Sequence, residues 1–368
     1  MSKATDQATE PGTGRSPAPA PARTPAPTGG QGPALRLGTR RSILARAQSG
    51  MVAEQVRQLT GRPVELVEIT TYGDTSREQL AQIGGTGVFV NALRDALRAG
   101  EIDFAVHSLK DLPTTQPEEF TLAAVPPRAD PRDALIARDG LTLAGLAGLA
   151  GPGESTGARG AGDGRPARIG TGSPRRVAQL QAWARDAGTE VETVPIRGNI
   201  DTRIGYVRSG ELDAVVLAAA GLQRTGRLDE ATELLSPDAV LPAPGQGALA
   251  VECAASSTHL AAQLAELDDP FTRAAVTAER TLLAALEAGC SAPVGALADL
   301  LADQQVVTEM RLRGVVGTTD GTTLVQLSTT GPVPASADDE TAPQRLGRQL
   351  ADEMLAKGAA GLMGERAL

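Results

Sequence analysis

The stretch Arg36-Leu-Gly-Thr-Arg-Arg-Ser42 has a counterpart later in the chain, Arg168-Ile-Gly-Thr-Gly-Ser173. Each reads as a strand that ends in Gly-Thr, followed by a Ser at the position of a helix N-cap. A helical pattern follows in both halves, and after it an alternating pattern predicts a strand, at 64–69 and at 191–196. The order of strand, helix and strand is therefore repeated.

A third pair of similar segments completes the repeat. Gly100-Glu-Ile-Asp-Phe-Ala-Val106 in the first half matches Gly210-Glu-Leu-Asp-Ala-Val-Val216 in the second. Three matches in the same order indicate two similar α/β domains. Strands that alternate with helices favour mainly parallel sheets, and such sheets bind their ligands beyond the carboxyl ends of the strands.

Composition divides the rest of the 368-residue chain, which is long enough for two or three domains at about 150 residues each. Residues 1–33 are rich in Pro, Ala, Gly, Ser and Thr and contain no apolar run, which predicts a disordered tail and not a signal peptide. The Gly- and Ala-rich stretch 140–167 has the composition of a mobile insertion.

A turn rich in Pro and Gly, Leu241-Pro-Ala-Pro-Gly-Gln-Gly247, leads into a strand-like segment and suggests that the chain crosses back between domains here. Asp269-Pro270 is a good helix start, and the residues after it predict a long helix, strands near 306–316 and 323–327, and a last helix. The predicted domains are a first α/β domain at 34–128 and 246–267, a second α/β domain at 129–245, and a smaller C-terminal α+β domain at 268–368.

The charge and composition exclude several classes of protein. The net charge of -9 and the aromatic content of 2% argue against nucleic-acid binding, which uses basic surfaces and aromatic stacking. No apolar run is long enough to span a membrane. Two cysteines and two histidines are too few for a disulfide framework or a His/Cys zinc site, so we expect no metal and a reduced, cytoplasmic location.

Arginines crowd both Gly-Thr turns, although they would oppose the helix dipole there by up to about 1 kcal/mol each. An anion would offset this cost, and helix N-termini with Arg side chains bind carboxylate or phosphate well. Ordinary capping with solvated arginines is the alternative for either turn alone. The turns hold Arg40, Arg41 and Ser42 in the first half, and Ser173, Arg175 and Arg176 in the second.

Further arginines follow the strand at 191–196, in the segment Arg197-Gly-Asn-Ile-Asp-Thr-Arg203, and Arg224 comes later. Some of these are expected to be ordinary surface residues. A ligand with several carboxylates would still use many of them, because each charge-assisted hydrogen bond contributes about 1.5–3 kcal/mol before desolvation. The pattern favours a polyanionic ligand.

The segment His107-Ser-Leu-Lys-Asp111 closes a predicted strand, so Ser108, Lys110 and Asp111 are expected at a strand end that faces the crevice. Lys-Asp before a proline is also typical of a surface turn, and His107 alone is more often a packed histidine than a base. Cys290 follows a predicted helix C-terminus, where the dipole raises a thiol pKa. A structural or attached cysteine therefore fits Cys290 better than a reactive thiolate.

Taken together, these segments resemble the porphobilinogen deaminase (hydroxymethylbilane synthase) family from about residue 34 to the end. The matching motifs, in family order, are Gly38-Thr-Arg-Arg-Ser42, Gly84-Gly-Thr-Gly-Val-Phe89, His107-Ser-Leu-Lys-Asp111, Gly170-Thr-Gly-Ser-Pro-Arg-Arg176, Arg197-Gly-Asn-Ile-Asp-Thr-Arg203, Leu241-Pro-Ala-Pro-Gly-Gln-Gly247 and Gly289-Cys290.

The resemblance implies a transferase of tetrapyrrole and haem biosynthesis. It would condense four porphobilinogen molecules, each with an acetate and a propionate, into a linear tetrapyrrole with loss of ammonia. It also implies a dipyrromethane cofactor joined through a thioether to Cys290, and a catalytic role for Asp111, whose carboxylate would stabilise a cationic pyrrole. The expected fold is α/β, with two similar periplasmic-binding-protein-like domains, mainly parallel sheets and the smaller α+β domain.

Other roles carry over residue by residue. Cofactor binding is expected of Asp111, Lys110, Ser108, Ser173, Arg175 and Arg176, and substrate binding of Arg40, Ser42, Arg197, Arg203, Arg224 and Gln246. The chain departs from many relatives at Gln82 and Thr86, where they have lysines in a glycine-rich segment that resembles a lid. No charge-binding role is assigned to these two positions.

The expected partner is therefore the small molecule porphobilinogen, with no nucleic acid and no membrane, and the expected state is a monomer. The main alternative is a non-enzymatic, two-lobed anion-binding protein, since its duplicated α/β halves would look alike. A ligand-sensing regulator is a third possibility, but no DNA-binding segment is recognisable. The Cys290 segment favours the enzyme.

Overall fold

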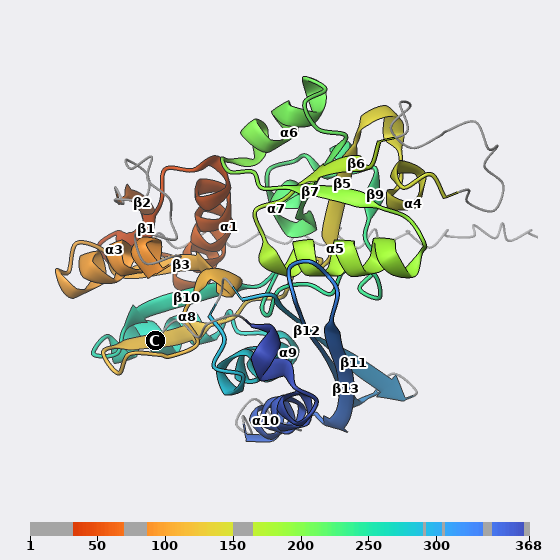
Figure 1. Cartoon of the computed structure of the whole chain (residues 1–368). Helices are drawn as coiled ribbons and strands as arrows, with labels where there is room; N and C mark the ends of the chain where they lie inside the picture. Colours follow the sequence, from red (N-terminus) through yellow and green to blue (C-terminus); the bar gives the residue numbers. More distant parts are fainter. Residues whose placement is uncertain are drawn as a thin grey trace, which may run out of the picture.

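The computed structural model describes residues 32–69, 87–149, 165–289, 292–303, 306–333 and 341–363. Figure 1 shows two α/β domains, at the left and at the upper right, and a third domain below them. The predicted tail at 1–33 lies almost wholly outside the described residues, as does most of the insertion at 140–167.

The first domain is built on a five-stranded sheet in the order β2-β1-β3-β10-β4. β1 pairs in parallel with β2 and β3, while β10 returns from much later in the chain and pairs antiparallel with β3 and β4. Helices α1, α3 and α8 flank this sheet (Figure 1). The elements are β1 (Leu35–Thr39), α1 (Ile43–Thr60), β2 (Val64–Glu68), α3 (Gly87–Arg98), β3 (Phe104–Ser108), β4 (Phe120–Ala124), β10 (Leu249–Ala254) and α8 (Thr258–Ala265).

The second domain repeats this arrangement with the order β7-β6-β8-β5-β9. β6 pairs in parallel with β7 and β8, and β5 pairs antiparallel with β8 and β9. The predicted pair of similar α/β domains is confirmed, and each sheet combines a parallel half with an antiparallel half. The elements are β5 (Asp133–Ala137), α4 (Leu143–Leu146), β6 (Ala167–Gly170), α5 (Pro174–Asp186), β7 (Val191–Val194), α6 (Ile200–Arg208), β8 (Ala214–Ala218), α7 (Ala219–Arg224) and β9 (Glu233–Leu234).

The sequence repeat has a physical basis in one contact that recurs in both domains. A Cβ on Gly38 would lie 2.3 Å from Ile102 Cδ1, and a Cβ on Gly170 would lie 2.5 Å from Leu212 Cδ1. Glycine near the end of β1, and at the end of β6, thus leaves room for the apolar residue of the Gly-Glu-Ile/Leu-Asp segment. That segment needs its own glycine too, because Gly100 and Gly210 both adopt positive φ, at 67° and 74°.

The aspartates of the same two segments make equivalent hydrogen bonds in the two domains. Asp103 Oδ2 accepts from the Arg36 backbone N–H at 2.7 Å, and Asp213 Oδ2 accepts from that of Arg168 at 2.8 Å. Each carboxylate thereby satisfies a backbone donor near the start of β1 or of β6. The matched residues of the repeat are those that join β1 to β3 and β6 to β8.

The third domain is a three-stranded antiparallel sheet covered by two helices, in the strand order β11-β12-β13. Its core is made of Ala, Leu, Val and Met side chains from α9, α10 and the sheet. The elements are α9 (Pro270–Ala285), β11 (Val294–Asp303), β12 (Val306–Gly317), β13 (Leu324–Pro332) and α10 (Thr341–Ala356), with short 3-10 turns elsewhere at Leu109–Asp111, Arg138–Gly140, Leu228–Glu230 and Ala359–Leu362.

Two segments differ from the sequence analysis. Strand β11 has no signal in the sequence, because its run of Ala and Leu favours helix, and only the pairing with β12 makes it a strand. The prediction of a mobile insertion from residue 140 is wrong at its beginning. Thr142 caps the short helix α4, and Leu143 and Leu146 are buried in the core of the second domain.

The strands of the three sheets fall inside the three predicted domain ranges, and the boundaries themselves remain predictions. The Asp269-Pro270 helix start is confirmed, with the Asp269 side chain accepting from the Thr272 N–H and Pro270 in the first turn. None of the helices in the described ranges has the length and apolar character needed to cross a membrane.

Glu279 on α9 joins the third domain to the crossing segments between the other two. Its carboxylate, 0% exposed, accepts two hydrogen bonds from the Arg128 guanidinium at 2.6 and 3.0 Å. It also accepts from the backbone N–H of Gly245 at 2.7 Å and of Ala298 at 3.0 Å. Four donors from three segments converge on one buried charge, so the packing of the domains depends on it.

We expect Glu279→Gln to lower the free energy of unfolding by about 3 kcal/mol or more, because it leaves the Arg128 charge buried without a carboxylate. Urea unfolding followed by circular dichroism measures the change. The matched control is Glu54→Gln on α1, which breaks a solvent-exposed ion pair with Arg57 at 2.6 Å and should leave the unfolding midpoint almost unchanged. Equal stability of the two variants would contradict the role given to Glu279.

Candidate active site

The segment that carries Lys110 and Asp111 is a single 3-10 turn, Leu109–Asp111, directly after strand β3. Leu109, the first residue of the turn, and Leu112, directly after it, are buried and anchor the turn in the core of the first domain. Lys110 is half-buried and the Asp111 side chain is exposed. The packing of the two leucines therefore presents the charged pair at the end of the strand, as the sequence predicted.

Two glutamines fix the polar side chains of this turn. Gln48 on α1 donates from Nε2 to Ser108 Oγ at 3.0 Å. Lys110 Nζ donates to Gln246 Oε1 at 3.2 Å, and Gln246 is only 1% exposed. Gln48 had no signal in the sequence, because a glutamine inside a helix pattern is not distinctive.

Asp133 connects this turn to the second domain. Gln246 Nε2 donates to Asp133 Oδ1 at 2.8 Å, and Arg176 Nη2 donates to the same oxygen at 2.7 Å. Arg175 Nη1 forms an ion pair with Asp133 Oδ2 at 2.8 Å. Lys110, Gln246, Asp133, Arg175 and Arg176 thus form one polar network, which we call the Asp133 network.

The anion that offsets the two arginines at the start of α5 is therefore part of the protein. Burial by itself raises the pKa of Asp133, but the charges of Arg175 and Arg176 outweigh it and hold the pKa well below its ordinary value. One carboxylate faces two guanidinium groups, so a positive charge remains at this helix start. Asp133 is not among the predicted site residues, because its only signal in the sequence is its place before the apolar run 134–137.

The two helix starts differ in their caps. Ser42 accepts a hydrogen bond from the Ala45 N–H at 3.2 Å, so the predicted cap of α1 is confirmed. Ser173 stands at the N-cap position of α5 and makes no capping hydrogen bond through its side chain, while Pro174 occupies the first turn. Its hydroxyl is thus not used by the helix. Arg40 is half-buried beside the first cap.

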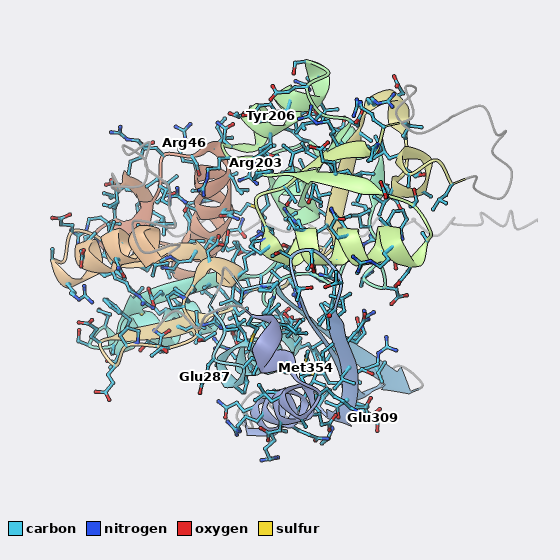
Figure 2. The ribbon with its side chains drawn as sticks, in the orientation of Figure 1. Arg46, Arg203, Tyr206, Glu287, Glu309 and Met354 are labelled. Carbon is cyan, nitrogen blue, oxygen red and sulfur yellow. The ribbon has the colours of Figure 1, made fainter. Side chains whose placement is uncertain are left out.

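A second group of arginines approaches the network from α6 and the loop before it. The pKa of Arg203 is lowered, first by burial and then by repulsion from Arg176 and Arg197, so these three charges share one region. Figure 2 shows Arg203 on the side of the second domain that faces α1, on which Arg46 is labelled. Arg203 Nε donates only to its neighbour Gly198 O, at 2.9 Å, and Arg197 is exposed.

Arg224 lies at the end of α7 and bridges the domains. Its Nη2 donates to Gly247 O at 2.6 Å, in the crossing segment, and burial lowers its pKa. Gln246, next in that segment, also donates to Pro131 O at 2.7 Å, so its amide is bonded at both ends. Its two Nε2 hydrogens are used by Pro131 O and Asp133 Oδ1, so Gln246 could donate to a ligand only if one of these bonds broke.

His107 is the packed histidine that the sequence analysis named as the more common case. Its Nε2 lies 3.2 Å from Glu252 Oε2, and the same carboxylate pairs with Arg94 at 2.8 Å. All three side chains are buried. The network of His107 therefore belongs to the core of the first domain, beneath the Lys110 turn.

Two predicted parts of the site fall outside the described residues. They are Cys290 and most of the glycine-rich segment, including Gln82 and Thr86. The described chain reaches Gly289 after the end of α9 at Ala285, so the helix that leads to Cys290 is placed. Among the described residues no cluster of three His, Cys, Asp or Glu side chains suits a metal ion.

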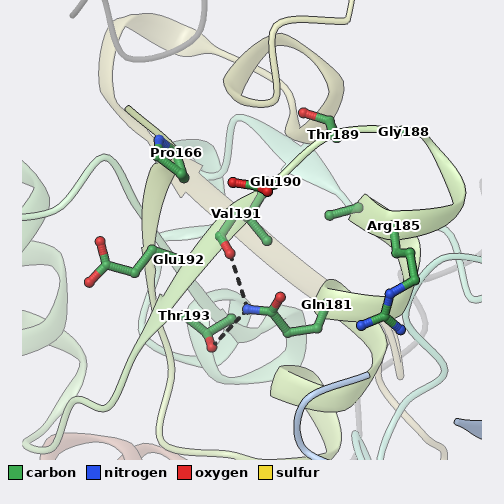
Figure 3. A pocket seen from close by; sticks show the side chains of 10 residues that line it. Pro166, Gln181, Arg185, Gly188, Thr189, Glu190, Val191, Glu192 and Thr193 are labelled. Carbon is green, nitrogen blue, oxygen red and sulfur yellow. Dashed lines mark hydrogen bonds between the residues drawn. The ribbon is translucent and has the colours of Figure 1, made fainter. Parts of the chain in front are cut away.

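A hollow of about 660 Å³ on the outer edge of the second domain contains none of the predicted site residues. It lies between α5 and β7, and Figure 3 shows Gln181 donating to Val191 O at 3.1 Å and to Thr193 Oγ1 at 3.3 Å across it. Arg185 at its rim donates to Asp320 O, in a turn of the third domain. The hollow is lined by residues of the second domain alone and is not part of the Asp133 network.

Comparison with known proteins decides the family. Residues 35–262 match the family model "Porphobilinogen deaminase, dipyromethane cofactor binding domain", and residues 273–356 match "Porphobilinogen deaminase, C-terminal domain". The chain belongs to the porphobilinogen deaminase family. The predicted resemblance is therefore confirmed, and residues 35–262 correspond to the part of the family that binds the dipyrromethane cofactor.

Similar curated proteins cover almost the whole described chain. Porphobilinogen deaminase 1 of Streptomyces avermitilis is 75% identical over 333 residues, which are 90% of this chain and 98% of that protein. Porphobilinogen deaminase 1 of Streptomyces coelicolor is 73% identical, over 91% of this chain and 98% of its own length. The porphobilinogen deaminase of Thermobifida fusca is 55% identical, over 90% and 96%.

Lys110 gives a pH-dependent test of the site. Burial lowers the pKa of Lys110 to about 8, and Asp111 opposes this shift. In the Cys290→Ala variant, which lacks the predicted attachment point, the acetylation rate of Lys110 by acetic anhydride should rise with a midpoint near pH 8. Mass spectrometry of the peptides measures it, with exposed Lys357 as the internal reference for the reagent.

The effect of Asp111 on the pKa of Lys110 can be tested separately. Asp111→Asn removes the charge that stabilises the ammonium, so the Lys110 midpoint should move to lower pH. A Lys110 midpoint in the parent variant close to the ordinary lysine value of about 10.4 would contradict the burial of this ammonium in the Asp133 network.

Proposed function

We propose that this chain is a porphobilinogen deaminase, which condenses four porphobilinogen molecules head to tail, with loss of ammonia, into the linear tetrapyrrole hydroxymethylbilane. The observation that carries the proposal is the Asp133 network, which joins Lys110 of the first domain to Arg175 and Arg176 of the second beside the exposed Asp111. Membership in the family gives this arrangement its substrate.

The excess of positive charge at the network suits a substrate with two carboxylates on every pyrrole. Asp133 offsets only one of the two guanidinium charges. Burial, and after it repulsion from Arg176 and Arg197, lowers the pKa of Arg203. An incoming carboxylate would relieve this repulsion and form charge-assisted hydrogen bonds. A growing chain of pyrroles brings more carboxylates, which supports the use of arginines from both domains.

The residues also fit the dipyrromethane cofactor. Nε of Arg175 and Nε of Arg176 are buried and have no hydrogen-bond partner in the described structure, which suits a group with several carboxylates. When bound, this group supplies the primer on which the chain grows. We propose that Cys290 carries it covalently and that Ser108, Lys110, Asp111, Ser173, Arg175 and Arg176 hold it.

Asp111 is proposed to do the catalytic work. Its carboxylate is exposed at the end of β3, so it can accept hydrogen bonds from pyrrole N–H groups. As ammonia leaves the substrate, positive charge develops on the ring, and a fixed carboxylate stabilises that charge more than it stabilises the neutral ground state. Arg40, Ser42, Arg197, Arg203, Arg224 and Gln246 are proposed to orient the substrate, Gln246 through Lys110.

We further propose that the enzyme is a cytoplasmic monomer. Cys253 is a buried free thiol, which agrees with a reducing compartment. The Asp133 network, the Lys110 turn and the arginine loops all come from one chain, so no second subunit is needed to complete them. A non-enzymatic anion-binding protein would not require Cys290, and family membership disfavours that alternative.

Intact-mass measurement tests the attachment. Protein made in a host that supplies porphobilinogen should carry an added mass of two pyrrole units, and the Cys290→Ala variant should not. The Cys253→Ala variant is the matched control and should keep the adduct, because Cys253 is buried in the core of the first domain. An unmodified wild-type mass under these conditions would overturn the proposed cofactor site.

Asp111→Asn should keep the fold and the attached cofactor, while the rate of hydroxymethylbilane formation falls by about 10²–10³-fold, as expected when a charge-stabilising group is removed. Single-turnover kinetics with porphobilinogen measure the loss. Asp229→Asn, a change at an exposed aspartate in the 3-10 turn Leu228–Glu230 of the second domain, serves as control. Near-normal turnover by Asp111→Asn would remove Asp111 from the mechanism.

A further inference from the structure

Arg280 on α9 donates three hydrogen bonds to the turn that carries Lys110 and Asp111. Its Nη1 donates to Leu109 O at 3.2 Å and to Leu112 O at 2.8 Å, and its Nη2 donates to Pro113 O at 2.7 Å. The three carbonyls lie immediately before and after the charged pair. A single guanidinium from the third domain thus donates hydrogen bonds to both ends of the predicted catalytic turn.

No carboxylate of the described residues pairs with the Arg280 guanidinium. Among the described residues it forms no ion pair, and its bonds go only to backbone carbonyls. Burial lowers the pKa of Arg280 to about 10, and Arg94 adds repulsion. Burying part of a cation without a paired carboxylate costs free energy. The contribution of Arg280 is therefore its hydrogen bonds to the turn and not an ion pair.

Helix α9 gives Arg280 a fixed position. Ala278 and Leu282, close to it in the helix, are buried in the core of the third domain, and Glu279 binds Arg128 and two backbone N–H groups. The helix ends at Ala285, and Cys290 follows five residues later. The position of α9 therefore sets both the place of the turn and the start of the segment that leads to Cys290.

We propose that Arg280 is a positioning residue that holds the Lys110-Asp111 turn at a fixed place relative to α9 and so aligns Asp111 with the chain that grows from Cys290. The role rests on the proposed function, and it is exerted through the backbone, because Arg280 binds no side chain of the turn. Loss of the three bonds lets the turn shift without removing any group that touches the substrate.

Arg273 on the same helix provides a matched control. It also reaches carbonyls of the first domain, Leu122 O at 3.3 Å and Ala123 O at 3.4 Å, but it pairs with Asp268 at 2.7 Å. Its contacts are made at β4 and not at the Lys110 turn. Removing Arg273 therefore disturbs the junction of the same domains while leaving the turn in place.

The experiment uses the holoenzymes of wild type, Arg280→Met, Arg280→Lys and Arg273→Met, each with its cofactor loading checked by intact mass. In Arg280→Met we expect kcat to fall by about 10–100-fold with little change in KM, because a small misplacement of a reacting group costs up to about 10²-fold. Arg280→Lys should keep part of kcat, because the lysine ammonium can still donate hydrogen bonds although its side chain is shorter. Arg273→Met should lower the melting temperature and keep kcat.

A normal kcat in Arg280→Met, or losses of kcat in both Met variants that follow their melting temperatures, would overturn the proposal. If Arg280→Met does not fold, Arg280→Lys and Arg280→Gln carry the comparison. The acetylation midpoint of Lys110, measured in the Cys290→Ala background, tests the turn without turnover. Displacement of the turn by Arg280→Met in this background should move the midpoint from about pH 8, and an unchanged midpoint counts against the role. An inactive wild type would contradict the proposed function. The Lys110 acetylation midpoint would still test whether Arg280 positions the turn.

Discussion

The Asp133 carboxylate is fully buried, and the arrangement of the site depends on it. It accepts from Arg176 and Gln246 and pairs with Arg175, and Gln246 in turn accepts from Lys110. A buried charge of this kind is stable only while all of its partners stay in place. The first turn of α5 and the turn after β3, which belong to different domains, are therefore held in one fixed relation.

Glu279 acts in the same way at the junction with the third domain. Together the two carboxylates explain how a chain of three domains keeps its functional groups in register. Asp133 joins the two α/β domains behind the site, and Glu279 joins α9 to the segments that cross between them. Arg280, next to Glu279, extends this connection to the Lys110-Asp111 turn.

The duplication places arginines on both sides of the site, but the two halves have diverged in use. Ser42 caps its helix, while Ser173 leaves its hydroxyl unused by α5. The arginines after Ser173 are buried and held by Asp133, whereas Arg41 before Ser42 is exposed. A common fold thus supplies one rigid half and one more accessible half, which suits a site that must hold a bound group and also admit a substrate.

The repeat can be predicted from matching segments, because Gly38 and Gly170 must leave room for Ile102 and Leu212 and this constraint is local in the chain. The turn at Lys110-Asp111 and, through the motifs, the family can be predicted in the same way. The pairing of the charges becomes visible only in the folded chain. Asp133, Glu279 and Arg280 lie 43, 34 and 168 residues from key partners, and no periodic pattern links such positions. The strand β11 likewise required its neighbour, because an Ala/Leu run becomes a strand only when another strand satisfies its backbone groups.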